Sequence, residues 1–136
     1  NQEFQLIEGV LELIKDYYKS GLNLVLASSA SMENINLIFK KFDLDPYFIR
    51  KLSGADLKAS KPHPEIFINA TEATGFSKES CFVIEDSTNG IRAAKSAGLF
   101  CVGFKGLHSK NQDYTDADMM IESFKEIEYS KIINKF

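Results

Sequence analysis

Residues 81–90 read Cys-Phe-Val-Ile-Glu-Asp-Ser-Thr-Asn-Gly, an apolar run followed by two acids and a series of turn-forming residues. The run has no alternation of polar and apolar residues, so it predicts a strand covered on both faces. Ile91, Ala94 and Ala97 follow at helical spacing, and Gly98 marks the end of that helix. This stretch therefore predicts a buried strand, a turn rich in oxygen atoms, and a helix.

The same order of strand and helix repeats along the chain. Further apolar runs predict strands at 22–27, 48–52 and 100–104. Residues at helical spacing predict three more helices, whose inward faces are Val10, Leu13, Ile14 and Tyr17; Ile35, Ile38, Phe39 and Phe42; and Ile66, Phe67, Ala70 and Ala73. A capping box predicts a last helix, with Ser123 and Glu126 at its start and Phe124, Ile127, Ile132 and Phe136 facing inward. Continuously apolar strands between amphipathic helices indicate an α/β fold with a doubly wound parallel sheet, and we expect residues 1–136 to form a single domain.

Composition excludes several classes of protein. The 136 residues are 44% hydrophobic and 26% charged, which is typical of a folded domain and not of a disordered chain. The net charge of −3 and the lack of a basic block argue against a nucleic-acid partner. No apolar run approaches the roughly 20 residues that cross a bilayer, so no membrane association is expected. Cys81 and Cys101 show no pairing pattern and predict buried, reduced thiols in a cytoplasmic protein.

Sheets of this kind bind ligands beyond the carboxyl ends of their strands, so the residues there are the candidates for function. Ser28 and Ser29 follow the first strand, where hydroxyl and backbone N–H groups can cradle an anion. The alternative for Ser28 is an ordinary helix cap, which Ser31 could supply unaided. Lys61 lies beside Pro62 in a loop and could present its ammonium group to a phosphate; the alternative is a solvated surface lysine.

Glu85 and Asp86 are the candidate metal ligands. Adjacent residues of a strand point to opposite faces, so the two carboxylates can converge only if the strand stops there, as the Ser-Thr-Asn-Gly run indicates. Paired carboxylates near a phosphate cradle suit Mg²⁺. The alternative is that the acids interact with the dipole of the following helix. His63 lies between two prolines and is expected to have a structural role, since no nucleophilic triad is evident.

Three segments in this order resemble the haloacid dehalogenase superfamily: Leu-Ala-Ser-Ser at 26–29, Ser-Lys-Pro-His-Pro-Glu-Ile-Phe at 60–67, and Val-Ile-Glu-Asp-Ser-Thr-Asn-Gly-Ile-Arg-Ala-Ala at 83–94. Within it, the chain is most similar to the β-phosphoglucomutase-like phosphatases and mutases. The resemblance implies that Ser28 and the N–H of Ser29 bind the transferring phosphoryl group and that Lys61 neutralises the phosphate and the nucleophile. It also implies that Glu85 and Asp86 hold Mg²⁺.

The resemblance further implies a Rossmann-like core in which the first, central strand carries an aspartate nucleophile, with a helical cap domain that selects the substrate. Neither is found in this sequence. Asp43 and Asp45 imitate the spacing of the nucleophile motif, but they end a helical stripe, so we expect them to be structural. In the sheet of the family, the missing strand lies between the strands that end at Ala27 and Ile84, and its absence would leave two open edges. The chain is therefore expected to be part of a larger polypeptide, or to have its sheet completed by another segment or chain.

The expected function is Mg²⁺-dependent phosphohydrolase or phosphomutase chemistry on a small phosphorylated metabolite, with a sugar phosphate favoured by resemblance. It would proceed through an aspartyl-phosphate, and this chain alone would be inactive. One alternative is a non-catalytic module that binds phosphate or a partner. Another is a phospho-receiver domain, although there the acids precede the hydroxyl and lysine, whereas here they follow them.

Overall fold

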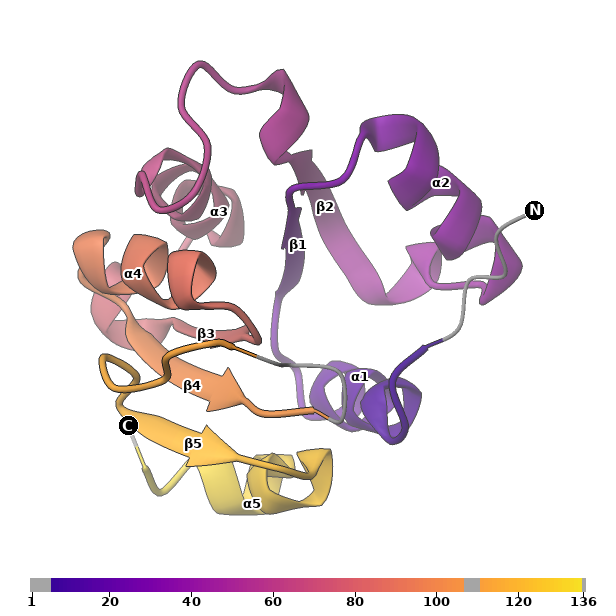
Figure 1. Cartoon of the computed structure of the whole chain (residues 1–136). Helices are drawn as coiled ribbons and strands as arrows, with labels where there is room; N and C mark the ends of the chain where they lie inside the picture. Colours follow the sequence, from indigo (N-terminus) through magenta and orange to yellow (C-terminus); the bar gives the residue numbers. More distant parts are fainter. Residues whose placement is uncertain (1–5, 107–110, 136) are drawn as a thin grey trace.

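The computed structural model describes residues 6–106 and 111–135 (Figure 1). Within these residues, five strands alternate with helices. The strands are β1 (Leu24–Ser28), β2 (Phe48–Ser53), β3 (Phe82–Glu85), β4 (Phe100–Phe104) and β5 (Met119–Ile121). The α-helices are α1 (Val10–Lys19), α2 (Met32–Lys41), α3 (Glu65–Thr74), α4 (Thr88–Ser96) and α5 (Tyr129–Ile132). Short 3₁₀ turns are η1 (Asp45–Tyr47), η2 (Gly54–Asp56), η3 (Lys78–Ser80) and η4 (Phe124–Ile127).

All strand pairs are parallel, but they form two sheets. One sheet has the order β1-β2 and the other the order β3-β4-β5. Ser28 lies opposite Ser53 in the first sheet, and Glu85 lies opposite Gly103 in the second. The candidate site residues Ser28 and Glu85 are thus the last residues of β1 and β3. The α/β class and the parallel strands are confirmed. The break in the sheet falls between β1 and β3, where the resemblance implied that a further strand belongs.

Helices cover both faces of the strands, as expected for a doubly wound arrangement (Figure 1). Three hydrophobic clusters form the core. One joins α1, β4, β5 and the C-terminal turns, and it includes Leu13, Tyr17, Val102 and Ile127. A second joins α3 and α4 to β3 and β4, and it includes Ile66, Phe67, Ile91 and Cys101. A third packs α1 and α2 against β1 and β2, through Ile14, Ile35, Phe39 and Leu44.

Several details differ from the sequence predictions. Strand β5 was not predicted, because it has only three residues and Met120 is half exposed. The capping box at Ser123 is present, but it opens the 3₁₀ turn η4, and the extended backbone of Glu128 separates this turn from the short helix α5. Phe136 lies outside the described residues. Cys101 is buried as predicted, whereas Cys81 is only half-buried. No helix in the described ranges has the length and hydropathy that a bilayer span requires.

Asp118 connects β5 to the start of β4 and to α4. Its Oδ2 accepts hydrogen bonds from the backbone N–H of Cys101 and from Nζ of Lys95, both at 2.7 Å. Partial burial acts to raise the pKa of this carboxyl, but the hydrogen bonds and the positive charge of Lys95 outweigh it, so the pKa lies below its ordinary 3.8. A folded-state pKa below the unfolded value means that ionised Asp118 stabilises the fold at neutral pH.

We predict that Asp118→Asn lowers the free energy of unfolding at pH 7 by about 1 kcal/mol, because a charged hydrogen-bond acceptor at a partly exposed position is replaced by a neutral one. The stabilisation is fully present above the unfolded pKa and is lost as the pH falls below it. Urea titrations at several pH values should therefore show the difference between Asp118→Asn and the parent chain shrinking below about pH 4. A difference that stays constant at low pH would contradict this role.

Candidate active site

A lysine–carboxylate pair lies where the two sheets approach each other. Nζ of Lys61 donates to Oε2 of Glu85 at 2.5 Å, and their side chains are only 10% and 9% exposed. The same Nζ lies 3.4 Å from the carbonyl oxygen of Ala27, near the end of β1, and 5.0 Å from the ring centroid of Phe67. Lys61 therefore contacts the carboxyl ends of both β1 and β3. The alternative of a solvated surface lysine is wrong.

The local sequence of α4 makes room for Glu85. Oε1 of Glu85 is 3.4 Å from the hydroxyl of Ser87, which also caps α4 by accepting from the N–H of Gly90. A Cβ atom at position 90 would overlap the carboxylate of Glu85, so only glycine lets the helix begin this close to the acid. The glycine of the motif thus has a steric role that the sequence pattern alone did not reveal.

Asp86 has surroundings that differ from those of Glu85. Strand β3 ends at Glu85, so Asp86 is the first residue of the turn, and it is exposed. No described residue donates a hydrogen bond to its carboxylate, although its backbone oxygen accepts one from the hydroxyl of Tyr114 at 3.1 Å. The structure thus leaves Asp86 open to a ligand and gives Glu85 a protein partner, Lys61.

The turn after β1 places Ser28 and Ser29 beside the end of β2. The Ser28 Oγ accepts from the backbone N–H of Ala30 at 3.1 Å, while Ser31 caps α2 by accepting from the N–H of Asn34. Ser28 is therefore not needed as the cap of that helix. Because its oxygen accepts the Ala30 hydrogen bond, its O–H remains able to donate to an anion. Ser29 is exposed at the tip of the turn.

Sequence reasoning missed Ser53 and Gly54, which support this turn. The hydroxyl of Ser53, 5% exposed, donates to the carbonyl of Ala30 at 2.6 Å and accepts from the N–H of Ala55. A Cβ at position 54 would lie 3.4 Å from the carbonyl oxygen of Ser28, so the chain approaches the turn closely. The available signal was a Ser-Gly pair directly after a predicted strand.

The residues expected to be structural have such roles. Nδ1 of His63 accepts from the N–H of Glu65 at the start of α3, close to the Lys61–Pro62 peptide bond, which is cis. Asp43 has a left-handed backbone in the turn after α2, and Asp45 pairs with Lys51 at 2.8 Å. Neither acid ends a strand, so neither has the position of a nucleophile in this fold.

The residues present fit Mg²⁺ as part of a ligand set. In the described parts of the chain, no three His, Cys, Asp or Glu side chains gather as a metal cluster. Mg²⁺ in phosphate-handling sites is bound by one or two carboxylates, substrate oxygens and water. The exposed carboxylate of Asp86 suits such a site, and the carboxylate of Glu85 lies directly before it in the chain.

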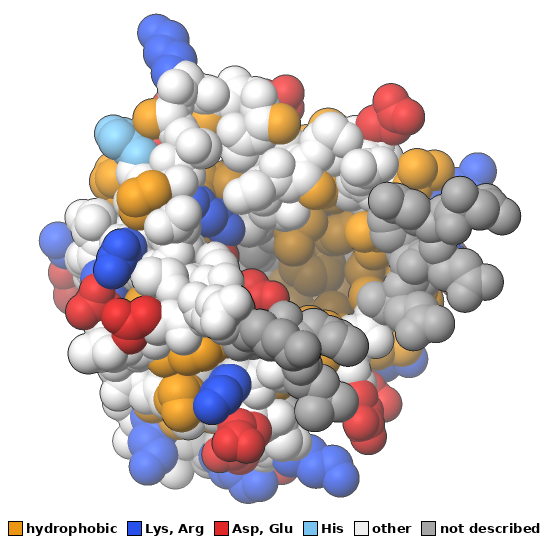
Figure 2. All heavy atoms as spheres, in the orientation of Figure 1, with side chains coloured by type: hydrophobic (Ala, Val, Ile, Leu, Met, Phe, Trp, Pro, Cys, Tyr) orange, Lys and Arg blue, Asp and Glu red, His pale blue; other side chains and the backbone are white. Residues whose placement is uncertain are grey.

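A hollow with hydrophobic side chains at its floor lies at the centre of the face shown in Figure 2. In Figure 1 the same place lies beside β1, between this strand and the helices α1 and α2. Every residue of β1 is only half-buried, and so are Phe82, Val83 and Ile84 of β3. In contrast, four of the five residues of β4, which pairs on both sides, are buried. The facing edges of β1 and β3 thus lack a partner strand within the described residues.

Comparison with known proteins agrees with this geometry. The model of the haloacid dehalogenase-like hydrolase family matches residues 1–104, so the chain belongs to that family. This membership excludes the phospho-receiver alternative.

Individual relatives place the chain near the β-phosphoglucomutase-like members. Protein CbbY of Cereibacter sphaeroides is 30% identical over 92% of this chain and 56% of its own length. Hexitol phosphatase B of Escherichia coli is 28% identical over 90% of this chain and 55% of its own length. The crystal structure of β-phosphoglucomutase from Clostridium difficile superposes with a TM-score of 0.79 at 25% identity, covering 93% of this chain and 54% of that one. The chain thus spans about half the length of the curated relatives it matches.

We predict that Lys61→Met lowers the free energy of unfolding by about 3 kcal/mol, because it leaves the Glu85 carboxylate buried without a counter-charge. Adding Glu85→Gln should restore at least half of this loss, since the double variant buries no charge. Urea denaturation of both variants and the parent chain measures these differences. Lys58→Met, at an exposed loop lysine, is the matched control and should change stability by less than about 0.5 kcal/mol. A Lys61→Met effect as small as that of the control would contradict the buried pair.

Proposed function

We propose that this chain forms the phosphate- and metal-binding part of a Mg²⁺-dependent phosphohydrolase or phosphomutase acting on a small phosphorylated metabolite, with a sugar phosphate as the favoured substrate. The observation that carries the proposal is the position of Lys61, which joins the ends of β1 and β3 and lies between the Ser28 turn and the acidic turn. Two of the similar proteins, a hexitol phosphatase and a β-phosphoglucomutase, support the substrate class.

The proposed phosphate site consists of Ser28, Ser29 and Lys61. An ammonium group has three donors; Glu85 engages one of those of Lys61 and the carbonyl oxygen of Ala27 a second, which leaves one donor for a phosphoryl oxygen. The O–H of Ser28 and the N–H of Ser29 would add two neutral donors. In phosphoryl transfer, most of the catalysis comes from positioning and from stabilising the charge on the equatorial oxygens, and these groups supply both.

The proposed metal ligands are Asp86 and Glu85. Asp86 would bind directly, because its carboxylate is exposed and accepts no hydrogen bond in the described structure. Glu85 would contribute its negative charge while it holds Lys61 in place. When bound, Mg²⁺ supplies positive charge to the phosphoryl oxygens.

The nucleophile is proposed to come from a strand that pairs with β1 on one side and β3 on the other. The open edges and the half-buried side chains of both strands support a strand at this place. The family resemblance implies that this strand carries the aspartate that forms the aspartyl-phosphate. Its carboxyl end would then lie beside Lys61, whose charge would stabilise both the nucleophile and the phosphate.

We predict that Asp86→Ala in the full protein lowers Mg²⁺-dependent release of phosphate from hexose or hexitol phosphates at least about a hundredfold in kcat/KM. Glu79→Ala, at an exposed acid on η3, is the matched control and should leave turnover unchanged. Colorimetric phosphate assays with and without Mg²⁺ make the measurement. Full turnover by Asp86→Ala would refute the metal assignment. A parent protein that binds phosphate yet turns over no phosphorylated metabolite would favour the non-catalytic binding module.

A further inference from the structure

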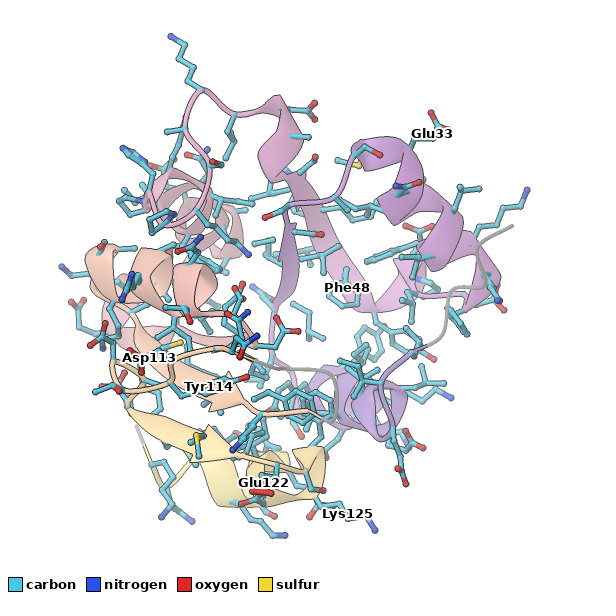
Figure 3. All side chains as sticks on the ribbon, in the orientation of Figure 1. Glu33, Phe48, Asp113, Tyr114, Glu122 and Lys125 are labelled. Atoms are coloured by element: carbon cyan, nitrogen blue, oxygen red, sulfur yellow. The ribbon has the colours of Figure 1, made fainter. Side chains whose placement is uncertain are left out.

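The segment 112–114, between β4 and β5, is hydrogen-bonded to the turn that carries Asp86. Figure 3 shows Asp113 and Tyr114 on the part of the chain that passes in front of β3 and β4. Oε1 of Gln112 accepts from the backbone N–H of Thr88 at 2.7 Å, and the N–H of Asp113 donates to Oγ1 of Thr88 at 2.6 Å. The hydroxyl of Tyr114 donates to the backbone oxygen of Asp86 at 3.1 Å. These three hydrogen bonds connect residues 24 to 28 positions apart in the sequence.

The ring of Tyr114 is held in place by β4. Tyr114 is half-buried and packs against the cluster formed by α3, α4 and β4. A Cβ atom at position 103 would lie 3.0 Å from Cδ1 of Tyr114 and 3.2 Å from Cβ of Ala117, so the ring needs glycine there. Gly103 is also the register partner of Glu85, and Tyr114 therefore lies beside the end of β3.

Two ion pairs connect the chain beyond this segment to α4. Asp118 pairs with Lys95 at 2.7 Å, and Asp116 lies 3.9 Å from the guanidinium of Arg92. Residues 112–118 thus follow the helix from its first turn to its last. The segment that contacts the Asp86 turn is consequently supported along its length by the helix that this turn opens.

We propose that Tyr114 is a positioning residue for the metal-binding carboxylate of Asp86, an inference that rests on the proposed function. No described side chain holds that carboxylate, so its direction depends on the backbone of residues 86–88. The Tyr114 hydroxyl fixes the peptide carbonyl of Asp86, and Gln112 and Asp113 fix Thr88. Groups that orient a metal ligand in this way commonly change metal affinity about tenfold or more when they are removed.

The position of Tyr114 predicts that its hydroxyl affects metal binding but not phosphate binding. It contacts the acidic turn, whereas the Ser28 turn is supported by Ser53 on the other sheet. Removal of the Tyr114 hydroxyl should therefore weaken metal binding and leave phosphate binding unchanged. A general loss of stability would affect both ligands.

The test compares Tyr114→Phe, which removes only the hydroxyl, with the parent in the full protein. Mn²⁺, as a spectroscopic substitute for Mg²⁺, is titrated by electron paramagnetic resonance, and inorganic phosphate is titrated by calorimetry. We expect the Kd for Mn²⁺ to rise about fivefold to tenfold, with the phosphate Kd and the melting temperature unchanged. Tyr18→Phe, at an exposed tyrosine on α1, is the matched control and should bind both ligands like the parent. Gln112→Ala, which removes a second contact to the turn, should also weaken Mn²⁺ binding.

The variant Asp86→Ala distinguishes a failure of the Tyr114 role from a failure of the proposed metal site. If Asp86→Ala abolishes Mn²⁺ binding while Tyr114→Phe binds like the parent, the positioning role is wrong and the proposed metal site stands. If Asp86→Ala leaves Mn²⁺ binding intact, the proposed metal site itself fails, and the role of Tyr114 fails with it. An equal loss of Mn²⁺ and phosphate affinity in Tyr114→Phe would show a structural effect and would also overturn the proposal.

Discussion

The ion pair between Lys61 and Glu85 is the contact on which the rest of the site depends. It places a positive and a negative charge together at a position that is about nine-tenths buried, where neither charge is tolerated alone. The surrounding sequence fits this need: Gly90 gives space for the carboxylate, and Phe67 lies under the ammonium group. Because Glu85 is paired with Lys61, Asp86 is the exposed carboxylate at this turn, and it is the one that we propose as the direct metal ligand.

Different residues hold the two turns that flank the Lys61–Glu85 pair. The Ser28 turn is supported by Ser53 and Gly54 at the end of β2, and the Asp86 turn by Gln112, Asp113 and Tyr114 from the β4–β5 connection. Lys61 contacts both sheets at their carboxyl ends. A ligand bound beside Lys61 would contact both the Ser28 turn and the Asp86 turn. Each turn is held by its own part of the fold, so both can be rigid although the sheet is interrupted between β1 and β3.

Much of this arrangement could be predicted from the sequence. The apolar run at 81–84 and the acids after it located β3 and its turn, because local patterns determine buried strands and their ends. The resemblance identified Lys61, which spacing alone could not distinguish from a surface lysine. Ser53 and Tyr114 could not be predicted, since each acts through a contact with a residue more than 20 positions away. Strand β5 was too short and too exposed to give a periodic signal.

The central claim is that Lys61 lies between a phosphate site at the Ser28 turn and a metal site at Asp86, beside a strand that completes the sheet. A crystal structure of the full protein with Mg²⁺ and a phosphate analogue tests it most directly. The account predicts a strand paired with both β1 and β3, the analogue bound by Ser28, Ser29 and Lys61, and the metal on Asp86. Direct pairing of β1 with β3, or an analogue bound away from Lys61, would contradict it.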